Sequence, residues 1–349
     1  MLAENGPLEA GARIWDHSRL IDRVRPEGSE RMLTRGARRV RYSDFNAISA
    51  AVASGGFTAV SPLRSGPFLL EAAGVGLGDG AVLAGRNSPL LVQGALPADT
   101  VWAVLPLGPD SPVLINGRAA GPNTLAVFGP GALHEAANHR EAGWALVALP
   151  AALADRHLEF PARLPLLRRG AHALLACDPE TWRQTARLLR SAAEVAVHDP
   201  EVFEVEEARR SLRSELLEAA RDLLSGGQGG KRARIRCAPS DRQRLVRAVE
   251  DDLRAHPERA PMAADVAAAL GVPAARLGRA IRATFGMGLA QYLLLRRLTL
   301  FRAALRAAGP GRRSPRDIAL THGFWHFGRL VKDYGEVFAE DLSGLFAGE

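Results

Sequence analysis

Basic side chains recur three residues apart in two segments of the last third of the sequence: Arg279 and Arg282 in the first, Arg329 and Lys332 in the second. Residues three or four apart lie on the same side of a helix, so each pair would offer its donors in one direction. An arginine so placed can donate two hydrogen bonds to the edge of a guanine in the major groove, or bind a phosphate. The chemistry open to these residues is nucleic-acid binding, and the alternative is an ordinary solvated charged face.

The distribution of charge favours the same chemistry. Residues 231–349 contain 21 Lys and Arg against 12 Asp and Glu, whereas residues 1–230 contain 24 against 26. The excess that gives the chain its net charge of +7 therefore lies entirely in the last third. An acidic partner such as DNA explains this asymmetry, although an arginine-rich composition can also reflect a GC-rich genome.

Each basic face has an apolar face opposite to it. The apolar positions are Leu277, Ile281 and Phe285 in the first segment, and Phe327, Leu330, Val331, Tyr334 and Phe338 in the second. These steps of three and four residues predict two amphipathic helices, each anchored in a core by its apolar side.

A short motif precedes each of these helices. Residues 266–271 read VAAALG and residues 318–323 read IALTHG, so a β-branched residue and Ala are followed by three more residues and Gly. In a helix-turn-helix the small Ala lets the second helix pack across the first, and Gly supplies the positive φ of the turn. Two such motifs, 52 residues apart and each followed by a basic amphipathic helix, predict a repeated helix-turn-helix.

An apolar segment joins the two units. Residues 288–309 (GLAQYLLLRRLTLFRAALRAAG) predict a helix of about 20 residues, which would be roughly 30 Å long at 1.5 Å per residue. That length is close to the ~34 Å between successive major grooves on one face of DNA. Such a helix would hold two reading helices one turn of DNA apart.

In combination, these motifs resemble the AraC/XylS transcription regulators. The similarity covers roughly residues 240–346, and GFWHFGRLVKDYGEVF is especially similar to a subset of that family. It implies a seven-helix domain that contacts two adjacent major-groove segments of promoter DNA. Carried over by position, the DNA-binding residues are Ala274, Ala275, Gly278, Arg279, Arg282, Trp325, His326, Gly328, Arg329 and Lys332. Trp325 stands next to the core residue Phe324, so both DNA contact and packing remain open for it.

The chain departs from the family pattern at two places. Family members usually have Pro at the position of Leu289, and G-x-x-P at the positions from Ala339 to Leu342. Both departures lie at helix starts beyond the reading helices, so they bear on local geometry rather than on DNA binding.

The N-terminal half predicts a different fold. Residues 40–150 consist of short apolar runs broken by Gly, Pro and Asn, which is typical of an all-β sandwich or barrel. Asn116-Gly117 is a two-residue hairpin signal, because both central positions need positive φ. This region resembles, more loosely, the cupin-type sensing domains of the same family, which implies a β-barrel for a small effector followed by dimerisation helices.

The predicted architecture is multidomain, with an N-terminal cupin-like β-barrel, a helical dimerisation region and a C-terminal all-α domain with two helix-turn-helix units. We expect a sensing domain at 1–165, a helical dimerisation or connecting region at 166–226, a linker at 227–239 and the DNA-binding domain at 240–349. Within the last, the first unit is expected at about 262–285, the linker helix at about 288–308 and the second unit at about 314–335.

A short heptad-like seam lies in the helical region. Its apolar members are Val205, Leu212, Leu216 and Leu223, interrupted by Arg209. They predict a dimer contact, with packing on the protein's own domain as the alternative.

Candidate ligand sites in the β-region are few. Trp102, Phe128 and Trp144 lie in strand-like runs and could line an effector pocket, with core packing as the alternative. His134 and His139 are the nearest match to the metal ligands of cupin enzymes, but no His-x-His pair occurs, and we expect surface or turn roles for them.

No catalytic residue, metal site or cofactor is therefore predicted. The cysteines Cys177 and Cys237 fit neither a disulfide framework nor a zinc spacing. No run approaches the roughly 18 apolar residues of a membrane span, and no signal peptide opens the chain, so we expect a cytoplasmic protein.

Together the motifs predict a sequence-specific transcription regulator and not an enzyme. The expected partners are promoter DNA, RNA polymerase, a second copy of the chain and a small-molecule effector. A cupin-type metal-dependent enzyme fused to a DNA-binding domain is the alternative.

Overall fold

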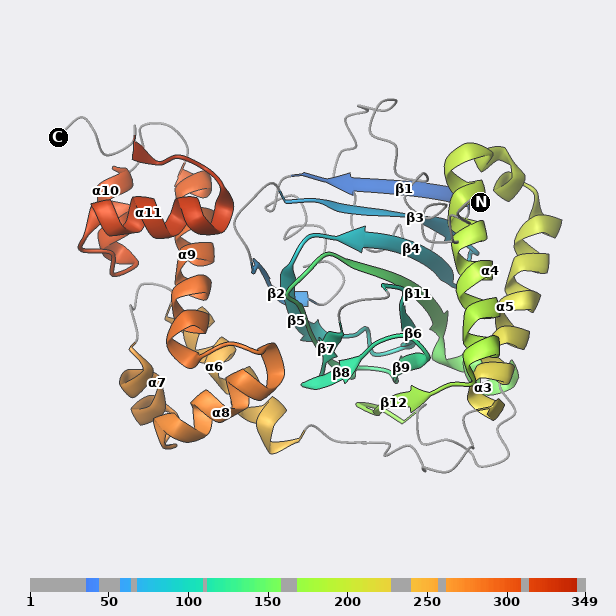
Figure 1. The fold of residues 1–349 in the computed structure, drawn as a ribbon, viewed down its shortest axis with the longest axis horizontal. Helices are drawn as coiled ribbons and strands as arrows, with labels where there is room; N and C mark the ends of the chain where they lie inside the picture. The colour runs from blue at the N-terminus through green and yellow to red at the C-terminus, as the bar shows by residue number, and fades with distance from the viewer. Residues whose placement is uncertain are drawn as a thin grey trace, which may run out of the picture.

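The computed structural model describes residues 36–43, 57–63, 68–108, 112–157, 168–226, 240–256, 262–308 and 314–343. The predicted linker at 227–239 and Cys237 lie outside these residues. Figure 1 shows a β-region with two long helices on one side and the C-terminal group of helices on the other.

The β-region consists of two antiparallel sheets. The strands are β1 (Gly36–Tyr42), β2 (Phe57–Pro62), β3 (Leu70–Gly76), β4 (Ala81–Asn87), β5 (Leu90–Ala95), β6 (Thr100–Pro106), β7 (Val113–Ile115), β8 (Arg118–Ala120), β9 (Thr124–Phe128), β10 (Leu133–Asn138), β11 (Ala142–Pro150) and β12 (His172–Ala176). One sheet has the order β1-β3-β4-β11-β6-β9-β12, and the other β2-β5-β10-β7-β8. The predicted barrel is thus a jelly roll whose two sheets remain separate in the described residues.

Successive side chains along the strands of the seven-stranded sheet point to opposite faces, and both faces are buried. In β6, Val101 and Leu105 belong to the core under the covering helices, whereas Trp102 points to the core between the sheets. Because both faces are buried, the strands read as nearly continuous apolar runs. The Asn116-Gly117 hairpin is confirmed: φ is 47° and 66° at these positions, and they join β7 to β8.

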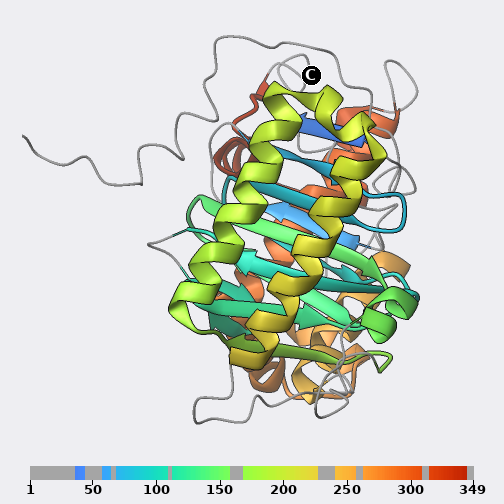
Figure 2. The ribbon, with the colours of Figure 1, turned by 90° about the vertical axis from the view of Figure 1, so that its right-hand side faces the viewer.

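Long helices cover the outer face of the seven-stranded sheet. They are α4 (Pro179–His198) and α5 (Glu206–Gly226), with the 3-10 turn η3 (Pro200–Glu204) between them and α3 (Ala151–His157) before them. Figure 2 shows α4 and α5 running side by side across that face. Asp178 caps α4, because its Oδ2 accepts from the backbone N–H groups of Glu180 and Thr181. Strand β12, in a segment predicted to be helical, closes the edge of the sheet beside β9.

The C-terminal helices form two small cores. They are α6 (Asp241–Ala255), α7 (Ala263–Ala269), α8 (Ala274–Phe285), α9 (Leu289–Ala308), α10 (Pro315–Thr321) and α11 (Phe327–Phe338). The first core gathers around Ile281, Phe285 and Tyr292, and the second around Phe301 and Tyr334. No helix in the described part of the chain combines the length and the apolar character that crossing a bilayer requires.

The outer face of the five-stranded sheet lies against these helices. Leu91 of β5 and Ala137 of β10 are fully buried in the same cluster as Phe285. The jelly roll therefore has helices on both outer faces: α4 and α5 on one, and the start of the C-terminal region on the other (Figure 1).

Candidate DNA-binding surface

The two predicted turns have the same backbone structure. Gly271 and Gly323 have φ of 62° and 71°. After α7, the N–H of Val272 donates to Ala267 O (3.0 Å) and that of Gly271 to Ala268 O. The matching bonds after α10 join Phe324 N–H to Ala319 O (2.9 Å), and Gly323 N–H to Leu320 O. Both are Schellman motifs, in which glycine takes the left-handed position.

The small Ala of each motif is buried, as predicted. Ala267 is 7% exposed and Ala319 is 0% exposed. The preceding β-branched residues, Val266 and Ile318, are also buried. A larger side chain at either Ala would push the second helix of its unit away from the first.

The first reading helix is α8. Its apolar face is confirmed, because Leu277, Ile281 and Phe285 are each 0% exposed. Pro273 precedes the helix as its N-cap residue. The predicted contact residues lie on the open side: Ala275, Arg279 and Arg282 are exposed, and Ala274 and Gly278 are half-buried.

The second reading helix is α11, and it begins after Trp325. His326 is its N-cap residue. The side chains of Arg329 and Lys332 are 77% and 74% exposed, and within the described part of the chain their ion pairs are long i,i+4 contacts with Asp333 and Glu336. Such exposed pairs contribute little, so these cations can move to a phosphate or a base.

Trp325 is 72% exposed, which places it outside the core. Its neighbour Phe324 is 6% exposed and packs edge to face on Phe301, with the ring centroids 5.6 Å apart. The segment before α11 thus divides its two aromatic residues between core and solvent. His326 and Gly328 are exposed beside Trp325.

The predicted connecting helix is α9, whose 20 residues give a length of about 30 Å. It contributes to both cores, with Tyr292 in the first and Phe301 in the second. The spacing of the two units is therefore set by one continuous helix.

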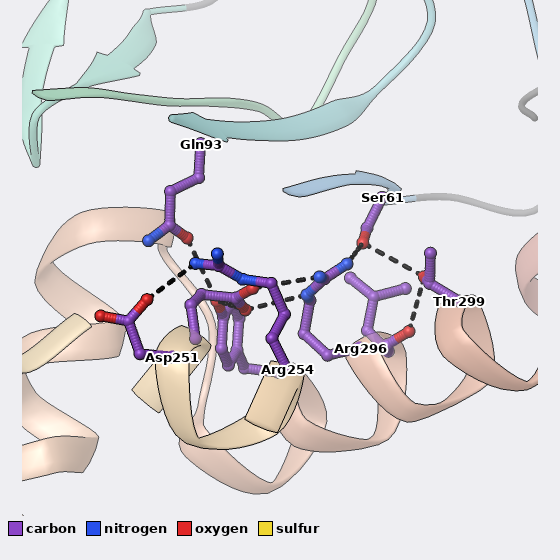
Figure 3. Close-up of polar contacts among 9 residues, drawn as sticks. Ser61, Gln93, Asp251, Arg254, Arg296 and Thr299 are labelled. Carbon is purple, nitrogen blue, oxygen red and sulfur yellow. Dashed lines mark hydrogen bonds and ion pairs between the residues drawn. The ribbon is translucent and has the colours of Figure 1, made fainter. Parts of the chain in front are cut away.

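A buried polar network joins α9 to α6 and to the five-stranded sheet. Arg296, which is 3% exposed, donates to both oxygens of Glu250 at 2.8 and 3.0 Å. Its Nη1 donates to Ser61 Oγ (3.0 Å), and Ser61 Oγ lies 3.2 Å from Thr299 Oγ1 (Figure 3). Tyr292 donates to Glu250, and its hydroxyl lies 3.3 Å from Gln93 Oε1. Burial, followed by the charge of Glu250, raises the pKa of Tyr292 well above its ordinary value.

No sequence pattern predicted this network. Glu250 and Arg296 read as charged positions on two amphipathic helices, and Ser61 is more than two hundred residues away from Arg296. The one available signal was an arginine pair, Arg296-Arg297, within an otherwise apolar helix.

The three aromatic residues predicted to line an effector pocket lie at the core between the sheets. Trp102 is 8% and Phe128 is 1% exposed. Trp144 packs against the same cluster, and its indole N–H donates to Asn87 Oδ1 (2.8 Å).

His134 and Glu135 project to opposite faces of β10. His134 is buried against Phe128, with the ring centroids 4.9 Å apart, so the predicted surface role is wrong for it. Burial lowers its pKa to about 4. Glu135 is 1% exposed on the face toward the C-terminal helices, and burial raises its pKa to about 8 against the opposing charge of Arg242.

His139 follows β10 in an exposed turn, in agreement with the prediction. Its Nε2 donates to the carbonyl of Phe285 at the end of α8 (2.8 Å). Among the described residues, no group of three His, Cys, Asp or Glu side chains is arranged to hold a metal ion.

Most of the residues of the predicted dimerisation seam are buried in the structure, and one is exposed. Leu212, Leu216 and Leu223 are buried in the core under α4 and α5, whereas Val205 is 51% exposed. Val202, in the turn before it, is 41% exposed. These two valines are the large apolar side chains that are exposed in the short segment just before α5.

Comparisons with known proteins give one family match and several similar structures. A family model described as a helix-turn-helix domain matches residues 266–346. The AraC-like transcriptional activator CuxR is similar in structure, with 15% identity over 81% of this chain and 98% of its own, and a TM-score of 0.42. ToxT from Vibrio cholerae O395 shows 10% identity over 77% of this chain and 97% of its own, with a TM-score of 0.26.

A cupin is also among the similar structures. An RmlC-like cupin from Shewanella frigidimarina NCIMB 400 has 13% identity over 27% of this chain and 84% of its own, with a TM-score of 0.19. No curated protein sequence matches the chain. The family model thus covers both predicted units, from the first turn to beyond α11, and identifies residues 266–346 as a helix-turn-helix domain.

Proposed function

We propose that this protein is a sequence-specific regulator of transcription that reads promoter DNA with α8 and α11. One observation carries the proposal: two helix-turn-helix units with the same turn are joined by a single helix, and each presents an exposed basic face. The length of α9 suits two reading helices in successive major grooves.

Each reading face has a role in this proposal. Arg279 and Arg329, at the middle of their open faces, contact base edges, where bidentate bonds to guanine are the commonest specific contact. Arg282 and Lys332 contact phosphate or neighbouring bases. The exposed Trp325 belongs with the DNA-contacting residues rather than with the core.

The double substitution Arg279→Ala with Arg329→Ala tests the proposal. We expect loss of specific binding by about thirtyfold or more, because each arginine–guanine contact is worth ~1–3 kcal/mol. The matched control is Arg244→Ala with Arg247→Ala, which removes two exposed arginines from α6. Sites selected from a random DNA pool by the wild-type protein would serve as probes. Retained site-specific binding by the α8/α11 variant would refute the proposed reading faces.

We further propose a regulatory role for the N-terminal part. A small-molecule effector would bind the jelly roll and change how it holds the C-terminal region, since the two are joined by buried contacts. A homodimer would bind paired half-sites in the cytoplasm and contact RNA polymerase. Val202 and Val205 are the apolar groups available for a dimer contact. The domain boundaries at residues 165, 226 and 239 remain part of this proposal. So does the expectation that the protein acts by binding DNA and not by catalysis.

A further inference from the structure

A small cavity lies where the jelly roll meets the first turn of α6. Its volume is about 80 Å³. Since one water molecule needs roughly 10–15 Å³ on this measure, the cavity has room for about five to eight water-sized groups. Its walls come from β7, β8, β9 and β12 on one side and from the start of α6 on the other.

The residues that line the cavity are of two chemical kinds. Ile115, Phe128 and Leu174 supply apolar surface that continues into the core between the sheets. Arg118, Arg242 and Gln243 supply hydrogen-bond donors. Arg242 is held in place by a bond from its Nη2 to the carbonyl of Asn116, at the tip of the β7–β8 hairpin.

Gln243 points to a hydrogen-bond acceptor as the ligand that the cavity would take. Its Oε1 accepts from the backbone N–H of Ser240 (3.0 Å) in the capping box of α6, so the orientation of the amide is fixed by a donor. The other end, Nε2, has no hydrogen-bond partner among the described residues, although Gln243 is only 1% exposed. A buried donor without an acceptor is costly, and an acceptor bound in the cavity would satisfy it.

The helix itself favours negative charge at this place. Gln243 is in the first turn of a 15-residue helix, and Ser240 is its N-cap residue. The N–H groups of the first turn have no intrahelical acceptor, and they carry the positive end of the helix dipole. No Asp or Glu is among the residues that line the cavity.

We propose that this cavity binds a small organic carboxylate. The carboxylate accepts from Gln243 Nε2 and pairs with Arg118 and Arg242, while the short apolar body rests on Ile115, Phe128 and Leu174. The apolar wall favours such a ligand over inorganic phosphate, which would lose its hydration there without compensation. Because the walls belong to both the jelly roll and α6, the bound ligand would tie them together. Its role as the effector rests on the proposed function, but its binding does not.

Calorimetric titration of the full chain tests the site without DNA. Butyrate and benzoate are the probes, and butyramide and benzamide are their uncharged counterparts. We expect both carboxylates to bind at least about tenfold more tightly than the amides and than inorganic phosphate, because a hydrogen bond to a charged group is stronger than a neutral one.

Two variants and one control locate the binding. Gln243→Glu keeps an acceptor for the capping box but replaces the Nε2 donor with a carboxylate oxygen, so affinity should fall at least about tenfold while the fold persists. Arg118→Gln should weaken binding similarly. Arg244→Gln, on the exposed side of the same turn, should bind as the wild type does.

Several outcomes would overturn the proposal. They are no binding of either carboxylate, equal binding of the amides, equal or tighter binding of phosphate, and unchanged affinity in Gln243→Glu. Carboxylate binding that leaves promoter affinity unchanged would uphold the site and remove only its role as effector site. Loss of DNA binding in the α8/α11 double variant is independent of all these results.

Discussion

The two helix-turn-helix units share one turn but have different neighbours. In the first, the end of α8 is held by the jelly roll, because His139 donates to the Phe285 carbonyl (2.8 Å). In the second, the end of α11 is held by its own region, because Glu340 accepts from Tyr334 (2.6 Å) and from Arg302 of α9 (3.2 Å). The jelly roll therefore holds the end of α8 by a direct hydrogen bond, whereas at the second unit Val60 of β2 joins the apolar core that α9 shares with α11.

The ends of the two reading helices show the same difference in their caps. Gly286 follows α8 with φ of 74°, and Ala339 follows α11 with φ of 53°. A Cβ at Gly286 would stand 2.7 Å from Nε2 of His139. Glycine at the first cap thus lets the jelly roll approach closely, whereas the second cap carries a side chain in a backbone conformation that costs energy.

The largest effect is expected from Arg296→Ala. It removes the partner of the fully buried Glu250 and the link to Ser61, so the free energy of unfolding should fall by about 3–5 kcal/mol. Chemical denaturation measures the change. The matched control is Arg254→Ala, which breaks an exposed pair with Asp251 and should cost less than about 1 kcal/mol. A similar small loss in both variants would show that the network does not hold α9 to the sheet.

Glu135→Gln should stabilise the protein at alkaline pH. The pKa of Glu135 is raised from 4.5 to about 8 in the folded chain, so its stability contribution is complete below pH 4.5 and is lost as the pH rises to about 8. At pH 8 the neutral amide should gain on the order of 2–4 kcal/mol over the wild type, and at pH 4.5 almost nothing. Unfolding free energies across this range are the measurement, with the exposed Glu218→Gln as control. A pH-independent difference would contradict the assignment.

Gly286→Ala should loosen the first unit from the jelly roll. The left-handed backbone costs about 1–2 kcal/mol with a side chain, and the new Cβ displaces His139 from the Phe285 carbonyl. Hydrogen exchange should rise at the end of α8 and stay unchanged in α11. Equal effects on both helices would mean that the two units are not held separately.

Ala339→Gly should produce the smallest effect, and in the opposite direction. Glycine adopts the φ of 53° without a steric penalty, so the second unit should gain about 0.5–1 kcal/mol. A rise in Tm reports it. AraC/XylS regulators, which the sequence resembles, usually have glycine at this position. A loss of stability in the variant would show that the Ala339 methyl group makes stabilising contacts.

Local chemistry made the C-terminal units predictable from the sequence. The glycines of both turns, the apolar faces of α8 and α11 and the Asn116-Gly117 hairpin are each decided within a few residues. The existence of a β-region followed from the same kind of short-range pattern. The order of its strands did not, because β12 pairs with β9 across a span that contains β10, β11 and α3.

Contacts between distant segments were beyond the sequence pattern. Nothing in Gln93 or Ser61 indicates a place against Tyr292 and Arg296, because small polar residues are common on exposed strand faces. Leu212, Leu216 and Leu223 have a spacing that suits either a dimer or a core, and only the sheet beneath them decides in favour of the core. Trp325 shows the opposite case. It is next to a core phenylalanine in the sequence, yet its side chain is exposed.

The uninterrupted α9 also restricts how the gene can change in length. One inserted residue would rotate everything beyond it by about 100° around the helix axis and shift it by about 1.5 Å. In the proposed complex the second reading helix would then face away from its own major groove, even with every side chain retained. Insertions and deletions in these 20 residues should therefore be far less tolerated in mutational libraries than substitutions on the exposed side of the same helix.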